Sequence, residues 1–171
     1  MLNALLPSDI GGLNIRHHGD FRLGQTLIVK DDIYIIDFDG NPHLPLAERR
    51  RKAPAARDVA GLVCSIDLCM TAALNRALKG APDERGRLAT VLGEWRERAT
   101  ATFLTAYREV MTDRRLWPND RHSTDGLLRF FLLDKMFDEV EYELSHRPEA
   151  LNVPLTGLLR ILSNAEGEAN A

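Results

Sequence analysis

The sequence has little net charge, few cysteines and no long apolar run, and each shortage excludes a class of protein. The 22 lysines and arginines and the 25 aspartates and glutamates leave a net charge of −3 on 171 residues. Nucleic-acid-binding domains usually carry a basic excess, so this balance argues against one. Charges interrupt the longest apolar stretches before the ~20 residues of a membrane-spanning helix, and no basic segment opens the chain as in a signal peptide. We therefore expect a cytoplasmic protein that binds neither nucleic acid nor membranes.

The two cysteines, Cys64 and Cys69, are too few for a zinc site. They lie five positions apart in a predicted helix, so their side chains point to different faces. No second pair of cysteine or histidine residues completes a zinc ligand set. We expect both to be reduced structural thiols.

What the sequence does have is enough apolar material for the core of one domain, with 44% hydrophobic and 27% charged residues. Its character changes near residue 54. Residues 1–54 are rich in glycine, aspartate and proline, and two short β-branched runs at 26–30 and 33–36 are typical of a tight hairpin. In residues 55–171, apolar residues recur at helical spacing. The expected fold class is mainly α with a small β-hairpin.

Four helices are expected in the second segment, each bounded by glycine, proline or cap-like residues. They cover residues 59–77, residues 88–110, a third run from the cap-like residues 123–125 to the residue before Pro148, and a last short run that begins near Pro154.

Two segments carry polar residues that suit phosphoryl transfer, HHGDFRLGQ at 17–25 and IIDFDG at 35–40. A kinase needs a carboxylate that accepts the proton of the attacking hydroxyl, and oxygen ligands that hold Mg²⁺ against the phosphates of ATP. Asp20 and Gln25 lie five positions apart on one loop, and the predicted hairpin returns Asp37 beside them. The residues therefore favour kinase chemistry.

The same segments resemble a known family. The order His-Gly-Asp, an amide five positions later, and then hydrophobic-Asp-Phe-acid is similar to the catalytic and metal-binding loops of aminoglycoside phosphotransferase-like kinases, which are relatives of the protein kinases. Within that superfamily, the chain most resembles the bacterial maltokinases, including those fused to trehalose synthase, from about Ile15 to the C-terminal helix. The resemblance rests on the segments HHGDFRLGQTL, IDFDGNP, LPLAERRRK and RDVAG.

This resemblance implies a fold, an activity and its ligands. The fold would be the C-terminal lobe of a protein kinase-like enzyme. The activity would be ATP-dependent conversion of maltose to maltose 1-phosphate, in trehalose, glycogen and α-glucan metabolism. Asp20 matches the catalytic base, and Gln25 and Asp37 match the ligands of Mg²⁺.

Further residues match supporting positions of the family. His18, Asp39 and Asp58 correspond to residues that support the catalytic loop, although the Asp58 carboxylate could equally serve only to favour the dipole of the helix it opens. The chain departs from the family at Asp39, where maltokinases usually have glutamate, and at Arg22, where they usually have histidine.

A sugar-binding surface is implied on the third predicted helix, where Lys135 and Tyr142 match maltokinase residues and Asp138 replaces a tyrosine. Helical geometry places these three positions on one side of the helix, where we expect a face free of the core that contacts the sugar. Without the resemblance, Lys135 and Tyr142 would be read as ordinary surface residues. The opposite side carries the stripe Phe130, Leu133, Phe137, Val140 and Leu144.

A complete kinase of this type has an N-terminal lobe that covers the nucleotide. Only 19 residues precede Asp20, and no glycine-rich phosphate loop lies among them. We therefore expect the C-terminal lobe alone, in which 1–54 supplies the catalytic loop and hairpin and 55–171 the helical body. Its partners would be ATP and a disaccharide, together with a separate N-lobe chain or trehalose synthase.

Two other functions stay open at this point. The chain could be a catalytically incomplete remnant that acts as a binding module for trehalose synthase or for a missing N-lobe. It could also be a stand-alone Mg²⁺-dependent binding protein or phosphatase that uses Asp20 and Asp37.

Overall fold

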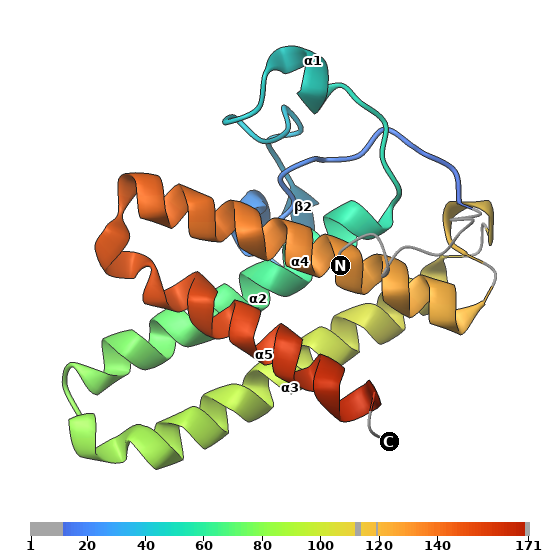
Figure 1. The fold of residues 1–171 in the computed structure, drawn as a ribbon. Coiled ribbons are helices and arrows are strands. Elements are labelled where there is room, and N and C mark those ends of the chain that lie inside the picture. Colours follow the sequence, from blue (N-terminus) through green and yellow to red (C-terminus); the bar gives the residue numbers. More distant parts are fainter. Residues whose placement is uncertain (1–11, 112–113, 119, 170–171) are drawn as a thin grey trace. The chain divides into compact units, whose positions relative to one another are not determined.

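The computed structural model describes residues 12–111, 114–118 and 120–169, which are mainly helical and include a two-stranded antiparallel sheet (Figure 1). These residues fall into two compact units. The first takes in the chain up to Val63 together with Met111–Leu132, and the second takes in Cys64–Val110 and Leu133–Ala171. The strands are β1 (Thr26–Val29) and β2 (Asp32–Ile35), and the helices are α1 (Leu46–Arg49), α2 (Ala56–Leu78), α3 (Arg85–Val110), α4 (Arg121–His146) and α5 (Asn152–Ala169).

This confirms the expected fold class, mainly α with a small β-hairpin. The C-terminal kinase lobe and the division into residues 1–54 and 55–171 stay predictions.

The hairpin forms as its composition predicts. Thr26 pairs with Ile35 and Val29 pairs with Asp32, which leaves a two-residue turn. Lys30 turns the chain with a φ of 58°, in the left-handed region that non-glycine residues adopt at some cost. The hairpin therefore joins the segment before β1 to the segment after β2 over a short distance.

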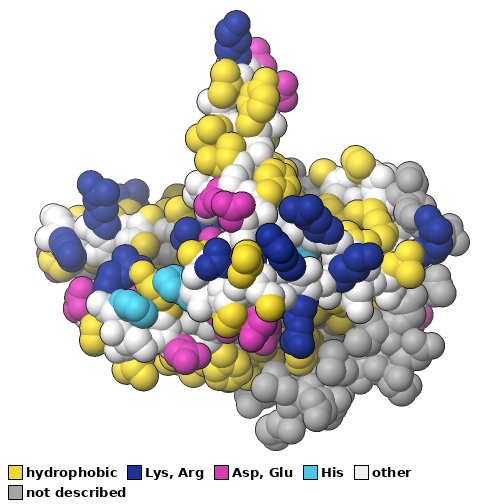
Figure 2. Space-filling view, turned by 90° about the horizontal axis from the view of Figure 1, so that it is seen from above, with side chains coloured by type: hydrophobic (Ala, Val, Ile, Leu, Met, Phe, Trp, Pro, Cys, Tyr) yellow, Lys and Arg dark blue, Asp and Glu magenta, His cyan; other side chains and the backbone are white. Residues whose placement is uncertain are grey.

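Hydrophobic side chains are exposed on both faces of this hairpin, and Figure 2 shows them along a finger with a charged tip. Successive side chains of a strand point to opposite faces, so a hairpin packed on one face would bury every second residue. Here both strands expose their large apolar residues, and monomeric proteins rarely expose so many next to one another. They are Leu27, Ile28, Val29, Ile33, Tyr34 and Ile35.

The long helices agree with the sequence periodicity, but each begins earlier than predicted, α2 and α3 by three residues, and α5 is also longer than predicted. α4 begins at Arg121 rather than after residues 123–125, because Asp120 caps it: the Ser123 amide donates to Asp120 Oδ1 at 2.8 Å. The hydrogen bonds from Ser123 hold the pKa of Asp120 below its usual range. α5 begins at Asn152, before Pro154, and continues to Ala169, so it is not the short helix that its leucine spacing predicted.

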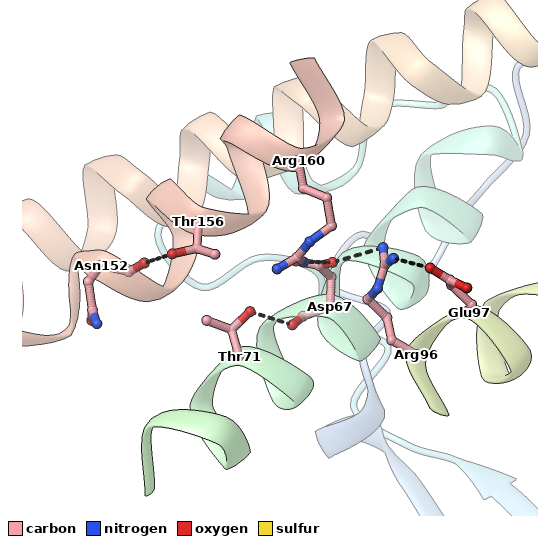
Figure 3. A network of polar contacts seen from close by, with 7 residues as sticks. All are labelled: Asp67, Thr71, Arg96, Glu97, Asn152, Thr156 and Arg160. Carbon is pink, nitrogen blue, oxygen red and sulfur yellow. Dashed lines mark hydrogen bonds and ion pairs between the residues drawn. The ribbon is translucent and has the colours of Figure 1, made fainter. Parts of the chain in front are cut away.

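The second unit is held together partly by charge (Figure 3). Asp67 of α2 is buried, and its Oδ1 accepts hydrogen bonds from Arg96 of α3, at 3.4 Å, and from Arg160 of α5. Arg96 also reaches Glu97 at 3.1 Å. α5 packs so closely against this carboxylate that a Cβ added at Gly157 would lie only 2.7 Å from Asp67 Oδ2. One acidic residue therefore links three helices of this unit.

α2 is a longer apolar segment than the sequence analysis recognised. Among the described residues, α2 is long and apolar enough to cross a membrane by length and composition alone, with a mean hydropathy of 1.3 over its most apolar window. Half of that window is buried inside the protein, and the helix carries Asp67 paired with two arginines. Core helices meet the same criteria, so α2 by itself is weak evidence for a membrane span.

Cys64 and Cys69 of α2 are both reduced, as predicted, but they differ in environment. Cys64 is buried, and this burial raises the pKa of its thiol well above the usual range. Cys69 is exposed. A structural role therefore suits Cys64 alone.

Candidate active site

The loop that carries Asp20 is anchored to the start of α2. Asp58 accepts hydrogen bonds from two consecutive backbone amides, that of His18 at 2.6 Å and that of Gly19 at 2.9 Å. Gly19 has a φ of 82°, and a Cβ there would lie 3.2 Å from the Cα atom of Gly40, so this position favours glycine twice over. The contacts suit the predicted support role of Asp58, which also lies in the first turn of α2, where the helix dipole favours a carboxylate.

His18 connects this loop to the segment after β2. Its Nδ1 accepts a hydrogen bond from the Asp20 amide at 3.3 Å, so the proton lies on Nε2, which donates to the Ile36 carbonyl at 2.8 Å. His18 is buried, and its ring contacts those of Phe21 and Phe38 at centroid distances of 5.6 Å and 4.7 Å. His18 therefore fixes the Asp20 backbone to the backbone that leads into Asp37.

Gln25 and Asp37 meet at the base of the hairpin. The Gln25 side-chain amide donates to Asp37 Oδ2 at 3.0 Å, and the Gln25 carbonyl accepts from the Ile36 amide at 3.0 Å. Gln25 is buried, whereas Asp37 is exposed and has a φ of 65°, a strained conformation for a residue other than glycine. Asp39 lies exposed in the turn that follows. The fold thus brings the predicted metal ligands together and presents Asp37 outward.

The donor set fits one kind of metal. In the described residues, no group of three or more histidine, cysteine, aspartate or glutamate side chains could hold a metal ion by itself. Mg²⁺ is commonly bound through one or two carboxylates, with phosphate and water oxygens completing its shell. The Gln25 NH₂ group donates to Asp37, so the amide oxygen is not used in that contact. This oxygen and the Asp37 carboxylate are oxygen ligands of the kind that Mg²⁺ takes.

Asp20 is buried, and one of its partners is a residue that the sequence analysis did not include in the site. Arg22 Nε lies 3.2 Å from Asp20 Oδ2. The spacing of the two residues does not by itself indicate this contact, and the resemblance showed only that arginine replaces a histidine here. The packing of Phe21 and Phe38 on His18 was missed as well.

The two predicted sugar-binding residues belong to the second unit, whereas the other six belong to the first. The apolar stripe predicted opposite them is only partly right: Leu133 is buried as expected, but Phe137 and Leu144 are exposed. Met136 and Glu143 are buried instead. The buried side of α4 therefore extends from Leu133 through Met136 and Glu143, toward the predicted sugar face.

Lys135 and Tyr142 consequently lie at the edge of the buried side of α4. Lys135 pairs with Glu139 at 3.1 Å, and the Tyr142 ring stacks on His146 at a centroid distance of 4.5 Å. Arg147 lies over the same tyrosine ring, 5.5 Å from its centroid. These neighbours contact the ring on which a sugar would stack, and the substrate role of this pair stays a prediction.

Gly61 sets how closely α2 can approach the loop that carries Asp20. A Cβ at this position would lie 2.6 Å from the Phe21 carbonyl oxygen, and a backbone atom cannot rotate away. We expect Gly61→Ala to lower the free energy of unfolding by about 1–3 kcal/mol in urea denaturation. Gly93→Ala is the matched control, since a Cβ there meets nothing within 4 Å and alanine should stabilise the helix by up to ~1 kcal/mol. An equal gain in both variants would contradict the close packing.

His17 makes stability depend on pH. Burial lowers the pKa of its imidazole from 6.5, although the nearby Asp58 carboxylate opposes this shift. Because the unfolded chain binds a proton more readily, the free energy of unfolding should fall as the pH drops below 6.5. Thermal unfolding between about pH 8 and 5 tests this against His17→Gln, which should fall less steeply, and His43→Gln, an exposed control that should follow the wild type. Parallel curves for the wild type and His17→Gln would refute it.

Comparisons with known proteins show similarity to glucosamine kinases, although no protein-family model matches the chain. A glucosamine kinase of Streptacidiphilus jiangxiensis is 32% identical over 145 residues, which cover 85% of this chain and 31% of that enzyme. A glucosamine kinase of Mycolicibacterium smegmatis is 32% identical over 157 residues, which cover 90% of this chain and 36% of that enzyme.

Solved structures give the same result. A glucosamine kinase in complex with glucosamine, ADP and inorganic phosphate has a TM-score of 0.75 and 30% identity, over 92% of this chain and 37% of that one. Crystal form B of a glucosamine kinase has a TM-score of 0.73 and 31% identity, over 88% and 35%. The chain thus spans about a third of the length of its relatives. These relatives are glucosamine kinases, so the resemblance to sugar kinases is confirmed and the narrower one to maltokinases is not.

Proposed function

We propose that the chain is the part of an ATP-dependent sugar kinase that carries the catalytic base and the metal ligands, with glucosamine as the first acceptor to test. The observation that carries the proposal is the connected set Asp20, His18, Asp37 and Gln25, held to α2 by Asp58. Its residue types suit phosphoryl transfer, and the relatives with this backbone are named glucosamine kinases.

In this reaction a sugar hydroxyl oxygen attacks the γ-phosphorus of ATP. The new O–P bond forms as the bond from the γ-phosphorus to the β,γ-bridging oxygen breaks, ADP leaves, and the hydroxyl proton passes to the Asp20 carboxylate. Burial of Asp20 excludes most water from this carboxylate, and His18 fixes the loop beneath it. Gln25 and Asp37 would hold Mg²⁺, which neutralises charge on the β- and γ-phosphates when bound.

The test uses the chain by itself and a hybrid enzyme, in which the chain replaces its matching 145-residue segment in the Streptacidiphilus glucosamine kinase. ATP-dependent phosphorylation of glucosamine and of maltose is measured for both. We expect the hybrid to phosphorylate a sugar, and the ratio of the two kcat/KM values identifies the acceptor. A hybrid that is folded by circular dichroism and binds ADP, yet phosphorylates no sugar, would overturn the proposal.

A second candidate, a binding module, is favoured by one observation, the exposed apolar residues on both faces of the hairpin. About two thirds of each relative has no counterpart in this chain, and such polypeptide could cover the hairpin. A binding module without catalysis would associate with the unmatched part of the Streptacidiphilus enzyme in analytical ultracentrifugation, and Asp20→Asn would change neither association nor any activity. An Ile28→Asp, Ile33→Asp double variant that associated as well as the wild type would exclude the hairpin as the contact.

A further inference from the structure

The carboxylate proposed as the catalytic base carries a cation at its outer edge. Asp20 is buried, with 9% of its side chain exposed, whereas 52% of the Arg22 side chain is exposed. Arg22 has extended backbone angles, φ −150° and ψ 166°, and its side chain lies on the side of the loop where the Asp20 carboxylate is found. The resulting Nε to Oδ2 distance is 3.2 Å. The guanidinium therefore stands between a buried carboxylate and solvent.

The chemistry of guanidinium gives this position a use. Arginine has five N–H donors in a planar fork, and the contact with Asp20 is made through Nε. The remaining donors belong to the more exposed end of the side chain, where two of them can grip a phosphate in parallel. Arginine stays charged across the physiological pH range, unlike a histidine at the same position. The site thus holds a permanent cation next to the proposed base.

We propose that Arg22 is a phosphate-binding residue, whose guanidinium bridges the Asp20 carboxylate and the phosphoryl group that the sugar hydroxyl attacks. The inference rests on the proposed kinase function and adds a residue to its site. In this geometry one cation keeps the base next to the reacting phosphorus and offsets charge on the phosphoryl oxygens. Arginines that contact a transferred phosphoryl group raise kcat by about 10³–10⁵ in nucleotide-hydrolysing enzymes, and a half-exposed one should contribute less.

The first test uses this chain alone, with inorganic phosphate as the probe in isothermal titration calorimetry and in NMR spectra of the Arg22 Nε–H group. The wild type should bind phosphate and shift that signal. Arg22→Gln should weaken binding about 10–100-fold, the loss expected for a charge-assisted hydrogen bond, and Arg22→Lys should weaken it less. Arg51→Gln removes an exposed arginine of the same unit and should bind like the wild type.

Three results would overturn the inference: no phosphate binding by the wild type, equal binding by Arg22→Gln, or a loss confined to Arg51→Gln. In the hybrid enzyme, Arg22→Gln should lower kcat with little change in KM for the sugar, and Arg22→Lys should recover part of the loss. If Asp20→Asn abolishes activity while Arg22→Gln leaves kcat unchanged, the inference about Arg22 fails and the kinase proposal stands. If the wild-type hybrid is folded and inactive while Arg22 still binds phosphate, the kinase proposal fails and the phosphate site stands.

Discussion

In the hybrid enzyme, Asp20→Asn is expected to lower kcat for sugar phosphorylation by a factor of about 10²–10⁴. Asparagine has nearly the shape of aspartate but cannot accept the hydroxyl proton, so the transition state loses its base while substrates still bind. The variant keeps the backbone amide that donates to His18 Nδ1, so the loop should stay in place. Steady-state kinetics should therefore show a large loss in kcat with little change in KM for ATP.

The control for this experiment is Asp83→Asn, which makes the same chemical change at an exposed residue of the short 3₁₀ helix Pro82–Glu84 in the second unit. Its kcat should equal that of the unmodified hybrid. An Asp20→Asn hybrid with at least a third of the unmodified kcat would show that Asp20 is not the base. A loss of folding, detected by circular dichroism, would instead show that the ion pair with Arg22 stabilises the loop, and Asp20→Glu would then separate the two roles because it keeps the charge.

The sequence was enough to predict the residues of the candidate site, but not the contacts that hold them in place. Residue types and the hairpin were enough to place Asp37 beside Gln25, since a two-residue turn leaves few ways to return the chain. The contacts from Asp58 to the His18 and Gly19 amides join residues about 40 positions apart, and no local pattern encodes such a distance. The resemblance suggested a supporting role for Asp58, whereas its two acceptor bonds are a property of the folded chain.

The errors on α4 have a physical cause. Counting apolar residues placed Phe137 and Leu144 inside, yet both are exposed, while the acidic Glu143 is buried and bonded to Arg147 at 2.5 Å. An ion pair allows a charged residue to occupy a buried position, which a rule based on hydrophobicity assigns to an apolar neighbour. The same reasoning explains Asp67, which lies buried in the middle of the most apolar helix.

The acceptor sugar was beyond this reasoning for another reason. In the proposed reaction the segments around Asp20 and Asp37 would contact the phosphoryl group, which all such kinases transfer, so these segments carry little information about the acceptor. The maltokinase resemblance was built largely on those segments, and the relatives found by comparison are glucosamine kinases.

Asp67→Ala should lower the free energy of unfolding of the chain by about 3 kcal/mol. The Asp67 side chain is 11% exposed, and it is the shared partner of Arg96 and Arg160, whose side chains are 20% and 24% exposed. Removing it leaves two cations near each other with most of their surface out of water, and the loss of a partner for a buried charge costs more than the contact itself contributes. Urea denaturation followed by circular dichroism gives the value.

Two further variants decide whether burial is the cause. Glu84→Ala breaks an exposed ion pair, in which the Glu84 side chain is 47% exposed and the Arg87 side chain is 70% exposed. It should change the free energy of unfolding by at most about 1 kcal/mol. The triple variant Asp67→Leu, Arg96→Met, Arg160→Met replaces the whole charged group with apolar side chains of similar size and should be more stable than Asp67→Ala, because it strands no charge. If Asp67→Ala and Glu84→Ala lost equal stability, the network would act as a surface ion pair. If the triple variant were the least stable, the ionic contacts themselves would hold α2, α3 and α5 together.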